Sequence, residues 1–205
     1  SADRLRGNQA ISTSPESRSL QVFSLFVQGE LELVEDTLAL TLGTKLEHND
    51  FTGFEIQPSL RLSYAIDEGH TLWAAASRAV RTPSRVDSDA RIDLSVSPTK
   101  LGVPLVTTDL GDDDFDSEVL HAYESGFRGE LCENLTLDAA LFLHHYDGLG
   151  ETALSDPFLV PGPNPFLQLF IRNQALEEGN AFGAEFSLVW QASEDLRIAA
   201  TYSYT

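Results

Sequence analysis

The sequence predicts an all-β fold, an antiparallel up-and-down meander of about eight strands. Apolar and polar side chains alternate with a period of two in eight segments, which places each kind on its own face of a strand. Short turns of Gly, Asp, Glu and Asn join most of these segments in pairs. No apolar run approaches the roughly 18 residues of a transmembrane helix. The predicted strands are 21–34, 37–47, 58–66, 71–79, 118–131, 135–143, 182–191 and 196–205.

The first two predicted strands form a hairpin around Glu35 and Asp36. Large apolar residues occupy every second position, and Ser, Thr, Gln, Glu and Lys occupy most positions between them. The apolar rows are Phe23, Leu25, Val27, Leu31 and Leu33 in the first strand and Leu38, Leu40, Leu42 and Leu46 in the second. Residues 1–18, which precede this hairpin, are polar and aperiodic, and this predicts a loop.

The third and fourth predicted strands are joined by the turn Asp67–His70, in which Gly69 is free to adopt a positive φ. The third strand has an apolar row of Leu60, Leu62, Tyr64 and Ile66. The fourth strand is ambiguous because alanines occupy both of its faces. Its charge suggests an orientation: if Arg78 lies on the polar face, Trp73 lies on the apolar one. Pro83 has no amide hydrogen to donate to a ladder, and this ends the strand.

Two long connections separate the remaining strands. Residues 80–117 contain an acidic cluster, and residues 147–178 are rich in Pro and Gly. The apolar rows of the last four strands are Val119, Tyr123, Phe127 and Leu131; Leu135, Leu137, Ala139, Leu141 and Leu143; Phe182, Phe186, Leu188 and Trp190; and Leu196, Ile198, Ala200, Tyr202 and Tyr204.

Short and long connections alternate along the chain. The short ones are 35–36, 67–70, 132–134 and 192–195, and the longer ones are 48–56, 80–117 and 147–178. Short turns at one end of the strands and long loops at the other are typical of an outer-membrane β-barrel. A soluble β-sandwich has no reason to keep all its long loops at one end.

Charged residues fall on only one of the two rows. The polar row carries Glu30, Glu32, Lys45, Arg61, Glu124, Arg128, Asp138, Glu185 and Arg197. In a soluble sandwich the apolar row faces a core, whereas in a wide barrel it faces lipid and the charged row faces a hydrated lumen. Periodicity alone does not separate these two structures. Five aromatic residues towards strand ends favour a membrane-interface belt over the alternative, the capped ends of a soluble core: Tyr64, Trp73, Trp190, Tyr202 and Tyr204.

Residues 50–85, 120–131 and 179–205 resemble the barrel of TonB-dependent outer-membrane receptors, and the resemblance extends over about 20–205. It implies a wall of about 22 strands that is filled by a plug domain. It also implies active transport of a ferric siderophore or similar iron complex, without enzymatic chemistry, in the outer membrane of a Gram-negative bacterium. The sequence shows no signal peptide, plug, TonB-box-like start or closing strand with a terminal Phe. We therefore expect residues 1–205 to be a partial barrel domain.

Composition limits the partners. The net charge of −19 argues against nucleic acid, whose phosphates need Lys and Arg. The single cysteine, Cys132, has no partner for an internal disulfide. The resemblance implies outer-membrane lipid and lipopolysaccharide around the wall, the TonB complex acting through a plug, and a small-molecule ferric chelate. We expect no cofactor.

The ligand-contact candidates are Arg78, Arg81, Arg85, Asp112, Asp113 and Asp114. The three arginines can meet an anionic ligand or lipopolysaccharide phosphates, or they can pair with the acidic loops. The aspartates offer oxygen ligands for Ca²⁺, but they lack the spacing of a calcium-binding loop, which favours a solvated acidic tip. His144 and His145 are adjacent in a strand and point to opposite faces, so they cannot chelate one metal together. We predict neither a metal site nor a catalytic site.

Alternative folds and functions lead to different sheets. A complete eight-stranded outer-membrane barrel with a structural or adhesive role would join strand 21–34 to strand 196–205 in one ladder. Its narrow interior would have to hold the charged row, which is costly. A soluble β-sandwich binding module would pack two sheets together, and a barrel enzyme is a more distant alternative. We expect an open, curved sheet whose first and last strands are unpaired edges.

Overall fold

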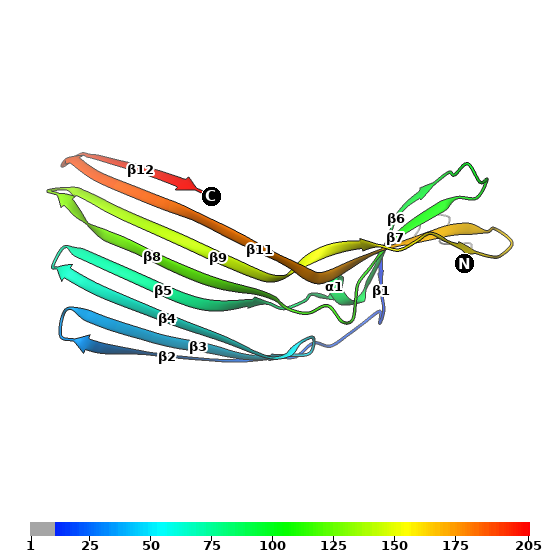
Figure 1. Cartoon of the computed structure of the whole chain (residues 1–205), viewed down its shortest axis with the longest axis horizontal. Coiled ribbons are helices and arrows are strands. Elements are labelled where there is room, and N and C mark those ends of the chain that lie inside the picture. Colours follow the sequence, from blue (N-terminus) through cyan, green and yellow to red (C-terminus); the bar gives the residue numbers. More distant parts are fainter. Residues whose placement is uncertain (1–10) are drawn as a thin grey trace.

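Long antiparallel strands lie side by side in one curved sheet, which confirms the all-β prediction (Figure 1). The computed structural model describes residues 11–205. The elements are β1 (Ile11–Thr13), β2 (Val22–Val34), β3 (Leu38–Asn49), β4 (Gly53–Asp67), β5 (His70–Arg81), α1 (Arg85–Asp89), β6 (Ala90–Ser97), β7 (Leu105–Leu110), β8 (Glu118–Cys132), β9 (Leu135–Leu154), β10 (Phe158–Val160), β11 (Phe166–Ser193) and β12 (Leu196–Tyr204). No helix within this range is long and apolar enough to span a membrane.

Eight of these strands form the predicted meander. β2, β3, β4, β5, β8, β9, β11 and β12 follow one another in the sheet, each antiparallel to the next. The tight turns lie together at one end of the sheet, which we call the turn end (Figure 1). The longer connections lie at the opposite end, which we call the loop end (Figure 1).

The sheet is open. In the part of the chain that the structure describes, β2 pairs only with β3, and β12 pairs only with β11. The prediction of two unpaired edges is therefore confirmed. A closed eight-stranded barrel would need a ladder between these edges, and a sandwich would need a second sheet packed on the first.

One side of the sheet, the apolar face, is a continuous field of large hydrophobic side chains. Leu40 pairs with Leu31 on β2 and with Leu62 on β4, so the apolar row continues across strands. These side chains lie uncovered: Phe23 and Phe182 are each 65% exposed. A field of this extent requires an apolar environment outside the chain, as a lipid-facing barrel wall does.

The other side, the polar face, carries charged side chains, and some of them form ion pairs. Arg128 on β8 forms an ion pair with Asp138 on β9. Lys45 Nζ lies 2.6 Å from Glu47 Oε2 on the same strand. A hollow of about 310 Å³ opens on this face between β9, β11 and β12. Its polar lining residues are Asp138, Glu185, Ser187, Thr201 and Ser203.

The predicted orientation of the fourth strand is wrong. Trp73 lies on the polar face, where the Arg61 guanidinium lies 5.0 Å from the centre of its ring. The ladder pairs Trp73 with Ser63 on the preceding strand and with Gly126 on the following one. Arg78 consequently falls in the row of the apolar face, beyond its hydrophobic part.

The predicted placement of aromatic residues towards strand ends is confirmed only in part. Tyr64 and Trp190 lie at the turn end of the apolar face, where Tyr64 pairs with Leu72 and Trp190 with Leu135. Tyr202 pairs with Phe186, well inside β11, and therefore lies away from either rim.

The long connections contain regular structure, contrary to prediction. Residues 80–117 include α1, β6 and β7, and β7 pairs in parallel with Leu167–Arg172 of β11. Residues 147–178 continue β9 and β11 as a ladder beyond the wall, and β11 reaches 28 residues. The 48–56 connection is only a turn at 50–52. Of the predicted loop 1–18, residues 1–10 lie outside the described range, and residues 11–13 form β1 against β6.

Several of the most buried side chains are polar and lie at the loop end. Thr108 is 0% exposed and Gln168 is 3% exposed. Gln168 Nε2 donates to Thr108 Oγ1 at 2.9 Å, and Thr108 Oγ1 donates to Asp93 Oδ1 at 2.7 Å. These bonds join β6, β7 and β11, and they satisfy groups that would be costly to bury alone.

Candidate functional site

The three candidate arginines lie at the loop end, and each is engaged by the chain itself. Arg78 is placed where β4 and β5 separate, just beyond the last ladder pair, Ser59 with Ser77. Its Nη1 donates to the carbonyl oxygen of Ile56 at 2.6 Å, and its Nη2 lies 3.5 Å from Glu55 Oε2. Arg78 therefore bridges the gap between these strands.

Arg81 lies just before α1, and Arg85 is the first residue of this helix. Arg81 Nη2 is 3.3 Å from Asp87 Oδ2, and Arg81 Nη1 is 3.1 Å from Glu118 Oε1. Arg85 Nε donates to Asp89 Oδ2 at 2.9 Å. Of the two roles considered for these arginines, the observed contacts are those of pairing with acidic residues of the loops.

The short helix α1 is fixed by its cap and by a buried carboxylate. Ser84 and Asp87 form a capping box, in which each side chain bonds the other residue's backbone N–H. Arg18, from the segment before β2, donates to Asp89 Oδ1 at 2.8 Å and lies over the Phe51 ring. The Asp89 side chain is fully buried, so its charge requires the two guanidinium partners that it has.

The three candidate aspartates form a turn after β7. Asp112 Oδ1 accepts a hydrogen bond from the Asp114 backbone N–H at 3.1 Å, while Asp113 is exposed. A hollow of about 210 Å³ lies between this turn and residues 174–176 of β11. Within residues 11–205, none of the three aspartates forms an ion pair with Arg78, Arg81 or Arg85. The structure thus leaves the two candidate groups apart.

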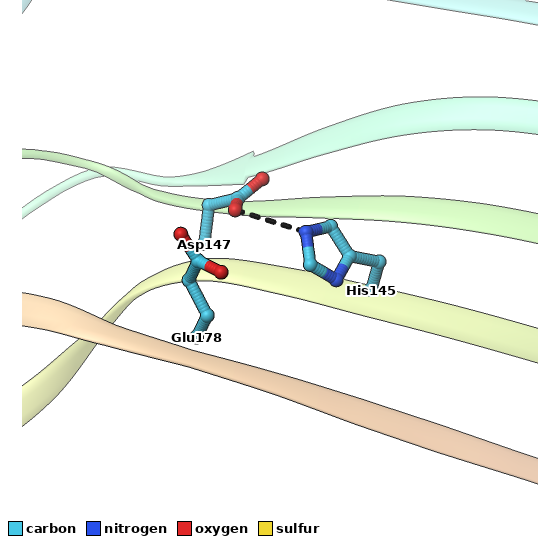
Figure 2. Close-up of side chains that lie close together, drawn as sticks. All are labelled: His145, Asp147 and Glu178. Carbon is cyan, nitrogen blue, oxygen red and sulfur yellow. Dashed lines mark ion pairs between the residues drawn. The ribbon is translucent and has the colours of Figure 1, made fainter.

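A cluster of possible metal ligands, missed from the sequence, lies where β9 leaves the wall (Figure 2). His145 and Asp147 come from β9, and Glu178 comes from β11. One ligand atom from each residue lies within 4.8 Å of the others. We call these three residues the His145 cluster. Asp147 and Glu178 were missed because both fall in the segment predicted as a loop.

The prediction that His144 and His145 face opposite ways is confirmed. His144 lies on the polar face, with Nε2 3.5 Å from Glu124 Oε1. His145 lies on the other face, where its Nδ1 is 2.9 Å from Asn180 Oδ1.

The sheet is open and antiparallel, with an exposed apolar face, a charged face and its long connections at one end. These features define a section of a large transmembrane β-barrel. A family model described as "TonB dependent receptor-like, beta-barrel" matches residues 2–205. The chain belongs to this family.

Relatives and solved structures agree with this assignment. The chain is 41% identical over 68 residues to the ferric enterobactin receptor of Pseudomonas aeruginosa and 32% identical over 71 residues to the ferrienterobactin receptor of Escherichia coli K12. These matches cover 33% and 35% of this chain and 9% of each relative.

Two solved structures have the same fold. The siderophore receptor PirA of Acinetobacter baumannii matches with a TM-score of 0.74 and 15% identity, over 90% of this chain and 27% of that one. The P. aeruginosa ferric enterobactin receptor PfeA matches with a TM-score of 0.74 and 22% identity, over 92% and 28%. The chain thus spans about a quarter of the receptors whose wall it resembles.

Proposed function

We propose that residues 1–205 form part of the barrel wall of an outer-membrane receptor that imports a ferric siderophore by TonB-coupled active transport. The observation that carries the proposal is the open wall with its exposed apolar face, in a chain that belongs to the TonB-dependent receptor family. Two unpaired edges suit a wall that continues on both sides. In this proposal a plug and the remaining strands complete the receptor.

The ligand class rests on the named relatives. The two relatives are receptors for ferric enterobactin; of the two solved neighbours, PirA is a siderophore receptor and PfeA is again a ferric enterobactin receptor. We therefore propose ferric enterobactin, or a siderophore of the same kind, as the imported ligand. The receptor performs binding and transport and no covalent chemistry.

The loop end is the part that faces the outside of the cell in this proposal. Its connections reach the ligand, with Arg78, Arg81, Arg85, Asp112, Asp113 and Asp114 as the contact candidates. The ion pairs of these arginines with other acidic residues of the chain favour a role in shaping the loops over direct charge contact with the ligand; their partners are Glu55, Asp87, Glu118 and Asp89. Lipid and lipopolysaccharide surround the apolar face, and the TonB complex acts through the plug.

Uptake of radiolabelled iron tests the function. Cells of the source bacterium that lack the full-length gene should lose uptake of ⁵⁵Fe-enterobactin, and a plasmid copy should restore it. A strain without TonB serves as the control for energy coupling and should fail to the same extent. Unchanged uptake in the deletion strain, together with no binding of ferric enterobactin to the purified receptor, would refute the proposed ligand.

A further inference from the structure

We propose that the His145 cluster binds a divalent transition-metal ion of the Zn²⁺ type on the outer side of the wall (Figure 2). The ligands are the imidazole of His145, the carboxylates of Asp147 and Glu178, and the imidazole of His121 in the fourth position. Imidazole nitrogen and carboxylate oxygen together are the donors that such ions take.

The register of the sheet brings these residues together. His121 on β8 is the direct cross-strand partner of His145 on β9, and Asn180 on β11 is the partner of His145 on its other side. Asp147 follows two positions after His145 and so shares its face. His145 Nε2 is 3.1 Å from Asp147 Oδ1, and His121 Nε2 is 3.7 Å from Asp147 Oδ2.

Asn180 acts as the outer partner that metal-binding histidines need. Its Oδ1 is 2.9 Å from His145 Nδ1, so this nitrogen carries the hydrogen and donates it. In the neutral imidazole, Nε2 then carries a lone pair and no hydrogen, and this nitrogen faces the Asp147 carboxylate. Two acceptors facing each other are stabilised by a cation between them, and a second-shell hydrogen bond of this kind orients the ligand ring.

Charge and reach are compatible with one dication. Within residues 11–205, no Lys or Arg pairs with Asp147 or Glu178, and the only ion-pair partners of these two carboxylates are the imidazoles of His121 and His145. A Zn²⁺ ion with two neutral histidines would neutralise both carboxylates. Tetrahedral ligands about 2.1 Å from zinc are about 3.4 Å apart. The 4.8 Å span of the cluster must therefore contract by about 1.4 Å to reach this ligand spacing, and half-exposed side chains such as Asp147 can rotate that far.

The position suggests what the ion does. The row Tyr123, Leu143 and Phe182 is the last hydrophobic row of the apolar face on these strands, and His121, His145 and Asn180 form the next row towards the loop end. The β9–β11 register shifts just beyond, between Glu177 and Gly179. An ion here would link β8, β9 and β11 at the point where the β9–β11 ladder continues beyond the wall through residues 147–178.

Cobalt titration of the full-length receptor in detergent tests the site. Co²⁺ bound by this set should give visible d–d absorption with one ion per chain, and Zn²⁺ should displace it. His145→Ala and Asp147→Asn should each abolish the signal, and Asn180→Ala should weaken binding about 10- to 100-fold. His144→Ala, the neighbouring residue on the opposite face, is the matched control and should bind Co²⁺ as the wild type does.

Circular dichroism of each variant separates loss of the site from loss of the fold, and Asp147→Asn changes the shape of the cluster least. No Co²⁺ absorption in the wild type would mean that the cluster holds only a proton-mediated ion pair, and would overturn the proposal. Equal loss in His144→Ala, or undiminished binding in folded His145→Ala and Asp147→Asn, would also overturn it. None of these outcomes depends on siderophore uptake, so the proposed function stands or falls separately.

Discussion

Arginine substitutions at the neighbouring positions 40 and 41 test which face of the wall meets lipid. Leu40 lies on the apolar face between Leu31 and Leu62, whereas Thr41 lies on the polar face between Glu30 and Arg61. The apolar row of β4 extends from Phe54 to Ile66, so its centre is within about two residues, roughly 7 Å, of the Leu62 partner of Leu40. Leu40 is therefore close to the middle of the apolar band.

An arginine at the bilayer midplane costs a barrel about 2–4 kcal/mol. We expect Leu40→Arg to reduce the folding equilibrium constant roughly 30- to 700-fold, since each 1.4 kcal/mol is a factor of ten. Thr41→Arg should change stability by less than about 1 kcal/mol, because it gains Glu30 and meets Arg61 in a hydrated setting. Reversible urea unfolding of the full-length receptor in lipid vesicles measures both. Equal losses at the two positions would refute the assignment of faces.

Three further outcomes are expected. At the turn end, His70 Nδ1 lies 2.6 Å from Asp67 Oδ1, and this hydrogen bond raises the pKa of His70. The pKa of Asp67 is lowered, first by the hydrogen bond from the Gly69 N–H and then by the bond to His70. His70 should therefore stabilise the fold below about pH 6.5, and this stabilisation should be lost as the pH rises through its raised pKa. In urea unfolding, the free energy of unfolding of His70→Ala should depend less on pH in this range than that of the wild type. Gly126→Ala should destabilise by about 1–3 kcal/mol, because its Cβ would lie 2.6 Å from the Trp73 ring and 2.5 Å from a carbonyl oxygen of β9; a neutral result in urea unfolding would contradict the packing. A cysteine at the exposed Asp113 should react with a membrane-impermeant maleimide on intact cells. Labelling only after the outer membrane is breached would show that the loop end faces the periplasm and would contradict the proposed topology.

The wall could be predicted from sequence because its information is local. Alternation along each strand, as from Leu38 to Leu42, fixes which side chains share a face, and short turns fix which strands are neighbours. The open edges followed from the charges of the polar row, which a narrow closed barrel could not hold. Trp73 shows the limit of this reasoning. Its strand carries alanines on both faces, and Arg78 lies beyond the hydrophobic band, where charge no longer marks the polar face.

The structure at the loop end depends on pairings between distant parts of the chain. β6 does alternate, with Ile92, Leu94 and Val96 separated by polar residues, and this signal was available in the sequence. Its position was not, because β7 pairs in parallel with β11 across about 60 residues of chain. The His145 cluster was missed for the same reason: Glu178 meets Asp147 only through the extended β9–β11 ladder.

The pairing of β7 with β11 has a consequence for the order in which the molecule forms and opens. Neighbouring wall strands are joined by turns or by structured connections, and most can pair soon after they emerge. The β6–β7 hairpin can dock on the wall only once β11 is in place, and β1 can join only after β6. Contacts of such long sequence separation form late and carry the largest loop-closure entropy. Amide hydrogens of β1, β6 and β7 should therefore exchange with solvent earlier than those of β3, β4 and β9, so the loop end can open while the wall stays intact.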